Sequence, residues 1–203
     1  MTTGRCQGKI AVLSGPRTAL ADAVASRLKE AGATVVDRIP SEGTVDILVW
    51  VAHYRDCGPL ETVSEEDFKC LVRDQLWAPY SATQAVLAGM RSKGAGWILH
   101  LGDPRAGHPL SLADVPGGTV HGPASTVMAA LSRLSTAMAA ELLSDGIAVN
   151  WLSPAVVDPD PSEMAALAET ALVLCTEPAA ECTARVVVGS ADLDGQDAPV
   201  VGK

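Results

Sequence analysis

Short apolar runs alternate with longer stretches of helical spacing along most of the chain. Because each run is continuously apolar over the length of a strand, these runs are typical of strands buried on both faces of a parallel sheet. This alternation predicts an α/β fold, a doubly wound, mostly parallel sheet of about six strands with helices on both faces. The predicted strands are residues 9–15, 33–38, 46–52, 96–102, 147–154 and 184–190, and the predicted helices are residues 18–31, 64–93, 123–144 and 162–175.

The ends of the predicted helices carry recognisable signals. Gly32, Gly94 and Gly146 each follow a predicted helix, and glycine tolerates the left-handed conformation that often ends a helix. Ser64 precedes three acidic residues, which makes it a good N-cap with negative charge at the positive end of the helix dipole. Pro79 lies inside the second predicted helix and should bend or divide it.

Composition limits the possible partners. The chain has 203 residues, 48% of them hydrophobic and 3% aromatic, which is enough for one core, and we expect a single domain over residues 1–203. The net charge of −9 would repel both nucleic acid and an anionic membrane. The first apolar run is too short for a signal sequence or a spanning helix. We therefore expect a soluble cytoplasmic protein that binds small molecules or other proteins.

The cysteines are scattered and odd in number. No two of them have the close spacing of a zinc or redox motif. We predict reduced, mostly structural thiols and no metal site. The five residues are Cys6, Cys57, Cys70, Cys175 and Cys182.

Five segments, taken in order, resemble the short-chain dehydrogenase/reductase family almost end to end. GKIAVLSG (8–15) resembles the first strand of the family, DILVWVAH (46–53) the fourth and GWILHLGD (96–103) the fifth. GIAVNWLSP (146–154) is similar to the strand before the substrate lobe, and residues 64–94 are similar to the long central helix. The resemblance implies a Rossmann-like fold and, in catalytic members, hydride transfer with a nicotinamide cofactor.

The turn that binds this cofactor in the family is altered. The family pattern TGxxxGxG is matched here by Ser14, Gly15, Ala19 and Ala21. The glycines that are missing let the backbone approach the pyrophosphate and let the helix pack on the strand. Pro16 also removes one backbone donor. We predict a turn that keeps the shape of a nucleotide loop but binds no cofactor.

A deletion removes the adenine side of the cleft. Between ATVV (33–36) and DILV (46–49) the family has a helix, a strand and a second helix, whereas this chain has only DRIPSEGTV. So short a segment cannot make that crossover. Asp37 lies about 20 residues after the glycine turn, where the family holds the adenosine ribose. Because no adenine wall remains, we interpret Asp37 as an exposed carboxylate.

The residues that handle protons in the family are also replaced. Catalytic members share a Tyr that exchanges the proton, a Lys that lowers its pKa, a Ser that polarises the carbonyl and an Asn that supports a relay water. The resemblance places Ala124, Met128, Asp103 and Gln75 at these four positions, in that order. The chain is therefore not expected to catalyse the redox reaction of the family by itself.

Two further comparisons with the family motifs give the same result. The family sequence NNAG after the fourth strand is replaced by WVAH at 50–53, where only Ala52 matches. If the loop before the third long helix is shifted, His121 and Ser125 take the Tyr and Lys spacing, but the register of the helix then fails.

The helices that pair subunits in the family are kept. They correspond to Ser64–Lys93 and Pro123–Ser144, and the second is rich in small residues with methionine and leucine at helical spacing. Small residues permit close approach, and methionines adapt to a partner surface. The leading hypothesis is a non-catalytic subunit that pairs through these helices with an intact short-chain dehydrogenase, as the structural or regulatory half of a heteromeric oxidoreductase.

The alternative hypothesis is a nicotinamide-independent dehydratase, isomerase or cyclase that reuses the cleft. His53 and Asp103 follow neighbouring strands, at the edge where ligands bind in such sheets. An imidazole oriented by a carboxylate is a workable general base, and His121 is a further candidate. His100 lies inside a strand and is predicted to be a residue of the core or of the cleft edge. Other possible donors are Tyr54, Arg55, Arg105 and His108.

Overall fold

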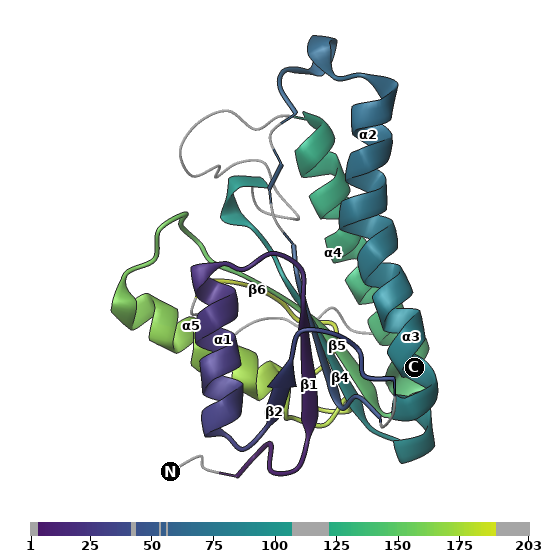
Figure 1. Cartoon of the computed structure of the whole chain (residues 1–203), viewed down its shortest axis with the longest axis vertical. Helices are drawn as coiled ribbons and strands as arrows, with labels where there is room; N and C mark the ends of the chain where they lie inside the picture. Colours follow the sequence, from purple (N-terminus) through teal and green to yellow (C-terminus); the bar gives the residue numbers. More distant parts are fainter. Residues whose placement is uncertain (1–3, 42–43, 53, 56, 107–121, 190–203) are drawn as a thin grey trace.

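The computed structural model describes residues 4–41, 44–52, 54–55, 57–106 and 122–189, which form a parallel sheet covered by helices (Figure 1). In this part of the chain the strand order is β2-β1-β3-β4-β5-β6, and every neighbouring pair is parallel. The strands are β1 (Ile10–Ser14), β2 (Thr34–Val36), β3 (Ile47–Val51), β4 (Gly96–Leu101), β5 (Ile147–Ser153) and β6 (Val186–Val188). The α-helices are α1 (Ala19–Glu30), α2 (Glu65–Val72), α3 (Ala78–Lys93), α4 (Gly122–Leu142) and α5 (Pro161–Leu174).

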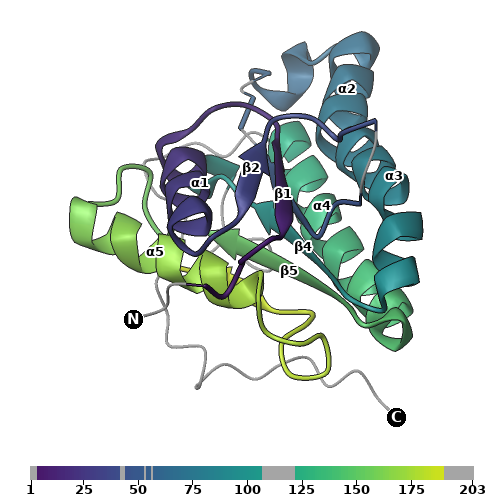
Figure 2. The ribbon, with the colours of Figure 1, turned by 60° about the horizontal axis from the view of Figure 1, so that its bottom comes forward.

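The helices form two layers, one on each face of the sheet. Helices α1 and α5 lie on one face, and α2, α3 and α4 lie on the other (Figures 1 and 2). This is the doubly wound, Rossmann-like arrangement that the sequence predicts. The ends of the six predicted strands and of the four predicted helical segments lie within two residues of the observed ends, except that the segment predicted at 64–93 is divided into α2, a π-turn and α3.

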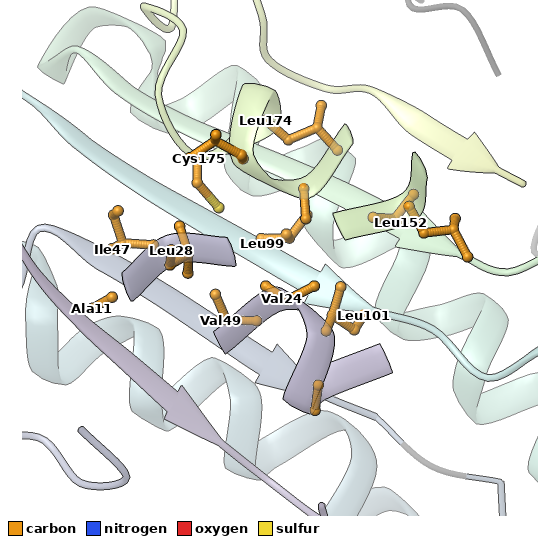
Figure 3. Close-up of a cluster of buried hydrophobic side chains, with 14 of the residues drawn as sticks. Ala11, Val24, Leu28, Ile47, Val49, Leu99, Leu101, Leu152, Leu174 and Cys175 are labelled. Atoms are coloured by element: carbon orange, nitrogen blue, oxygen red, sulfur yellow. The ribbon is translucent and has the colours of Figure 1, made fainter. Parts of the chain in front are cut away.

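The core under α1 and α5 is aliphatic. Figure 3 shows Val24 and Leu28 of α1 together with Val49 of β3 and Leu99 of β4, and all four side chains are fully buried. Three cysteines complete this cluster, and burial raises the pKa of each of their thiols. No disulfide joins cysteines in the described part of the chain. The three buried residues are Cys6, Cys175 and Cys182.

The core on the opposite face contains a row of large rings. Trp50, His100 and Trp151 lie beside one another in register on β3, β4 and β5. Trp151 packs with Met128 and Leu131 of α4. The space between α4 and the sheet is therefore filled by large side chains from both layers.

The predicted helix signals are confirmed. The Ser64 hydroxyl accepts a hydrogen bond from the Asp67 N–H at 3.1 Å, so it caps α2. Gly94 and Gly146 have φ values of +63° and +72° and end α3 and the short 3₁₀ turn that follows α4. The left-handed conformation at these two glycines lets the chain turn into β4 and β5.

Pro79 is accommodated by a widened turn. Residues Arg73–Trp77 form a π-turn, in which the Ala78 N–H donates to the Arg73 carbonyl oxygen. Pro79 then takes the second position of α3, directly after the π-turn, where it has no N–H to donate to the preceding turn. The predicted division of the long helix is therefore present, but it lies one turn ahead of the proline.

The short connection after β2 leaves that strand at the edge of the sheet. Residues 37–46 lead from β2 directly to β3, which lies on the other side of β1. In the described part of the chain, no strand lies outside β2. The edge of the sheet at β2, where the sequence predicts the deletion, is therefore not covered by a further strand of the described residues.

Candidate functional site

The turn between β1 and α1 lies against the end of β3. Gly15 has a φ of +115°, and a Cβ at this position would lie 2.3 Å from the carbonyl oxygen of Val51. Only glycine avoids both this contact and the strain of the positive φ. The single glycine kept in the turn is therefore required by its packing on β3, whether or not a ligand binds.

The polar groups of this turn interact with its own helix. The Thr18 hydroxyl accepts a hydrogen bond from the Ala21 N–H at 3.1 Å and caps α1. Arg17, the one cation in the turn, forms an ion pair with Asp22. Pro16 has no N–H to offer. The Thr18 hydroxyl and the Arg17 guanidinium are therefore both engaged within the turn and its helix.

Two cavities at the carboxyl edge of the sheet share Val51 in their lining. The first has a volume of about 380 Å³, and its polar lining residues are Thr18, Asp103, Arg105 and Asp158. The second has a volume of about 650 Å³ and lies beside β2, lined by residues that include Gly15, Ala21, Lys29 and Asp37. Ligands of open α/β sheets bind at this edge, so these cavities form the candidate site. Asp37 is exposed, as predicted.

Asp103 is the most strongly bonded polar residue of the first cavity. Its Oδ1 accepts hydrogen bonds from the Arg105 N–H at 3.0 Å and from Arg105 Nε at 2.9 Å. Its Oδ2 accepts from the Tyr54 N–H at 2.9 Å and from Arg105 Nη2 at 2.6 Å. The side chain of Asp103 is 9% exposed. This carboxylate therefore joins the loops that follow β3 and β4.

These contacts set the ionisation of the pair. Burial by itself would raise the pKa of the Asp103 carboxyl, but hydrogen bonds from the Arg105 side chain and from the two backbone N–H groups outweigh it and lower the pKa. The same hydrogen bond raises the pKa of the Arg105 guanidinium. The guanidinium also lies over the Tyr54 ring, 5.8 Å from its centroid. Asp103 is thus a charged, fully bonded structural acceptor.

Helix α4 directs Ala124 and Met128, which the family resemblance places at the Tyr and Lys positions, into the core. Ala124 and Met128 are 3% and 4% exposed. Met128 contributes to the cluster formed with Ala52, Leu131 and Trp151. Neither side chain can exchange a proton or carry a charge. Gln75, at the Asn position, is buried within the π-turn.

His100 is a core residue, as predicted. It is fully buried, and burial lowers the pKa of its imidazole to about 4. Its Nδ1 lies 2.7 Å from the Ser135 hydroxyl, which donates to the Leu131 carbonyl oxygen at 2.8 Å. His100 Nδ1 is then the donor to Ser135 and Nε2 is unprotonated. The ring is neutral at physiological pH and ties β4 to α4.

The structure brings only part of the predicted acid–base constellation together. His53, His108 and His121 lie outside the described residues, so the pairing of His53 with Asp103 stays a prediction. Sequence reasoning missed that Asp103 is bound to Arg105. The spacing of two residues between an acidic and a basic side chain, directly after a strand, was the available signal.

Neither a metal centre nor a membrane span is evident in the described residues. No group of three or more His, Cys, Asp or Glu residues there could hold a metal ion. No described helix is long and apolar enough to cross a membrane.

Comparisons with known proteins identify the relatives of this fold. A family model described as short chain dehydrogenase matches residues 21–170. Two curated relatives, the 3-oxoacyl-[acyl-carrier-protein] reductases FabG of Vibrio harveyi and Vibrio cholerae, are 24% and 23% identical over 192 residues, which cover 76% of this chain and 75% of each relative.

Solved structures give the same picture of the fold. A gluconate 5-dehydrogenase from Burkholderia cenocepacia, in complex with NADP and tartrate, superposes with a TM-score of 0.71 at 20% identity, covering 90% of this chain and 93% of its own. A short-chain dehydrogenase/reductase from Burkholderia xenovorans superposes with a TM-score of 0.75 at 19% identity, covering 96% of this chain and 100% of its own.

Proposed function

The chain belongs to the short-chain dehydrogenase family, and we propose that it is a non-catalytic member that pairs with a catalytically intact relative. In this role it forms the structural or regulatory half of a heteromeric oxidoreductase. The observation that carries the proposal is the burial of Ala124 and Met128 at the positions where catalytic members have Tyr and Lys. Reduction of a carbonyl needs a proton donor beside the oxygen, and these two positions provide none.

The residues of the cleft do not fit the nicotinamide dinucleotide that the family implies. Gly15 packs against the Val51 backbone, and Arg17 forms an ion pair with Asp22. Pro16 offers no N–H, and the β2 edge has no further strand in the described residues to wall an adenine. The proposed role therefore involves no nicotinamide bound to this chain.

The outer faces of α2, α3 and α4 support a role in pairing. Phe68 and Trp77 are 40% and 58% exposed on α2 and the π-turn. Small side chains are exposed along α3 and α4, where they permit close helix packing. These small residues are Ser81, Ala85 and Ala88 on α3 and Thr126, Ala137 and Ala140 on α4.

The proposal is tested by purifying the tagged chain from its own host and identifying every protein that copurifies in fixed stoichiometry. We expect an intact short-chain dehydrogenase with its Tyr and Lys. Ala85→Glu on α3 should release that partner, whereas Ala155→Glu, at an exposed position after β5, should retain it. Recovery of this chain without any relative would contradict the proposal.

Cofactor binding gives a second, independent test. Titration of NADPH into the isolated chain, followed by nucleotide fluorescence, should give no saturable signal. A clear binding isotherm would reject the proposed loss of cofactor binding. When the assembled pair is titrated with the same nucleotide, the number of bound nucleotides should equal the number of intact subunits, with none bound by this chain.

A second candidate function is a nicotinamide-independent acid–base enzyme, which one observation favours. The cavity of about 380 Å³ beside Asp103 is large enough for a small ligand. For His53 to act with Asp103, its imidazole would have to displace one of the four hydrogen bonds that this carboxylate accepts. If a turnover assay is found, unchanged activity of His53→Ala would exclude this candidate.

A further inference from the structure

The cavity beside Asp103 has a mostly aliphatic wall and a small set of charged residues. It has a volume of about 380 Å³, which suits a small ligand, and it lies between the start of α1 and the segment that joins β5 to α5 (Figure 1). No aromatic side chain is among its described lining residues. The aliphatic lining residues include Val51, Leu101, Val157 and Met164. The charged lining residues are Asp103, Arg105 and Asp158.

Arg105 is held in one orientation at this cavity, and part of its guanidinium is still available. Its Nε and Nη2 each donate a hydrogen bond to the Asp103 carboxylate, and the guanidinium lies over the Tyr54 ring. A guanidinium has five N–H donors, so those that do not donate to Asp103 remain for another acceptor. The Arg105 side chain is 50% exposed. A guanidinium fixed in this way can bind a carboxylate with little further loss of side-chain freedom.

Asp158 carries a second charge at the same cavity. It is exposed, and no ion pair joins it to another residue in the described part of the chain. The pKa of the Arg105 guanidinium is raised mainly by the Asp103 hydrogen bond and also by the charge of Asp158. Arg105 and Asp158 therefore interact through space but are not in direct contact.

The balance of these charges restricts the class of ligand. Asp103 and Arg105 neutralise one another, so Asp158 leaves one excess negative charge in the described lining. This excess disfavours a simple carboxylate, because its charge would be repelled by Asp158. A simple amine would use Asp158 but would leave the free N–H groups of Arg105 without an acceptor. A ligand with both charges on adjacent atoms matches both residues.

We propose that this cavity binds a small aliphatic α-amino acid, with its carboxylate on the Arg105 guanidinium, its ammonium group on Asp158 and its side chain against the aliphatic wall. Both charged groups of an α-amino acid are bonded to the same carbon atom, so one ligand bridges the gap between the two residues. The proposal goes beyond the pairing role above, because it concerns a ligand of the isolated chain.

Isothermal titration calorimetry of the purified chain with three matched compounds tests the two charged contacts. L-Leucine carries both charges, 3-methylbutylamine lacks only the carboxylate, and 4-methylpentanoate lacks only the ammonium group. We expect L-leucine to bind at least tenfold more tightly than either, because each of the other two loses one set of charge-assisted hydrogen bonds. Glycine should also bind more weakly, since it has no aliphatic side chain to bury.

Two variants assign the contacts to residues. Asp158→Asn should weaken L-leucine binding at least tenfold and remove the preference for L-leucine over 4-methylpentanoate. Glu181→Gln is the matched control, because it makes the same change in charge at an exposed position beyond the C-terminal end of α5 and outside the cavity lining. Arg105→Gln should remove the preference for L-leucine over 3-methylbutylamine. Circular dichroism checks that each variant is folded.

Three results would overturn the assignment. The first is the lack of saturable L-leucine binding at millimolar concentration. The second is binding of the amine or of the carboxylate compound as tight as that of L-leucine, and the third is L-leucine binding by Asp158→Asn equal to wild type. The titrations use the purified chain, so they do not depend on whether an intact relative copurifies from the host. The amino-acid site and the heteromeric role can therefore fail separately.

Discussion

Gly15 lies against the backbone of Val51, so closely that a Cβ on residue 15 would be 2.3 Å from the Val51 carbonyl oxygen. The contact fixes the turn after β1 on the end of β3, and it forms part of the wall between two cavities that both include Val51. It also explains why this glycine is present while Ala19 and Ala21 take the other glycine positions of the family. The packing of the turn on β3 needs a glycine at position 15, whereas Ala21 is accommodated in the buried contact between α1 and the sheet.

Gly15→Ala should lower the free energy of unfolding by about 3 kcal/mol or more, because it combines a positive φ with a contact that backbone atoms cannot relieve. Gly8→Ala is the matched control. Gly8 has a φ of +74° with open space around it, so that variant should lose only about 1 kcal/mol from backbone strain. Chemical denaturation of both variants measures the difference. Equal losses would show that the Val51 contact is unimportant.

Restoring the family residues should not restore catalysis. Met128→Lys places an ammonium group among Ala52, Leu131 and Trp151, and a buried, unpaired charge costs several kcal/mol or loses its proton. We expect Ala124→Tyr/Met128→Lys to be less stable than wild type and still unable to oxidise NADPH with a ketone substrate. Met128→Leu keeps the volume and polarity and should cost less than about 1.5 kcal/mol. Hydride transfer by the double variant would show that the site is intact apart from these residues.

The stability of the fold should depend on the pH through His100. Burial lowers the pKa of the folded His100 to about 4, from 6.5, so between these values the unfolded chain binds more protons than the folded chain. The free energy of unfolding should therefore fall as the pH drops from about 6.5 toward 4, by up to about 1.4 kcal/mol per pH unit. Urea unfolding across this range measures the slope. His100→Gln should remove this contribution, and an identical slope in the variant would contradict the assignment.

Asp103 should also make the free energy of unfolding depend on the pH, in a more acidic range than His100 does. The pKa of its carboxyl is lowered in the folded chain, so its stabilising contribution is complete above the unfolded value of about 3.9 and is lost as the pH falls through the folded value. Asp103→Asn keeps the shape of the side chain but weakens its bonds to Arg105 and to the Tyr54 N–H. The variant should have a lower free energy of unfolding than wild type at pH 7, and this difference should become smaller below pH 4. A difference that does not change with pH would show that the charge of Asp103 has no role.

The pairing of His100 with Ser135 offers a test of the α4 layer. Ser135→Ala leaves His100 Nδ1 without its partner at 2.7 Å in a fully buried position. Losing the partner of a buried polar group costs about 1–3 kcal/mol. Ser132→Ala is the control, because the Ser132 hydroxyl is buried without a hydrogen-bond partner, and removing it should be neutral or stabilising. Thermal unfolding of the two variants compares these effects.

The sequence predicted the architecture well because each element carries its own local signal. Continuous apolar runs identified the strands, and the glycine after each of the first three predicted helices marked its end. The segment DRIPSEGTV (37–45) left no room for the further strand and two helices that the family has there, and in the described part of the chain no strand lies outside β2. Ser64 was identified as a cap because it precedes acidic residues. These are properties of neighbouring residues, so they can be inferred without knowing the tertiary structure.

The candidate site was harder to predict because its contacts join distant segments. Asp103 was expected to orient an imidazole, but in the structure it holds Arg105 and the Tyr54 N–H. Pro79 was expected to disturb its own position, but the helix instead widens in the preceding turn. Both outcomes depend on which neighbouring groups reach the same space, and periodicity alone does not contain that information.

The sequence by itself determined the order of strands and helices and the short connection from β2 to β3, and it places Ala124 and Met128 where the family resemblance implies Tyr and Lys. Composition and spacing suffice for these features because they follow from chain length and residue chemistry. Only the tertiary structure decided that Gly15 is held by the Val51 carbonyl, that Asp103 is saturated by hydrogen bonds and that His100 is buried beside Ser135. The physical reason is that burial and hydrogen bonding depend on contacts between residues that are far apart in the sequence. These contacts form only when the sheet and its two helical layers pack together.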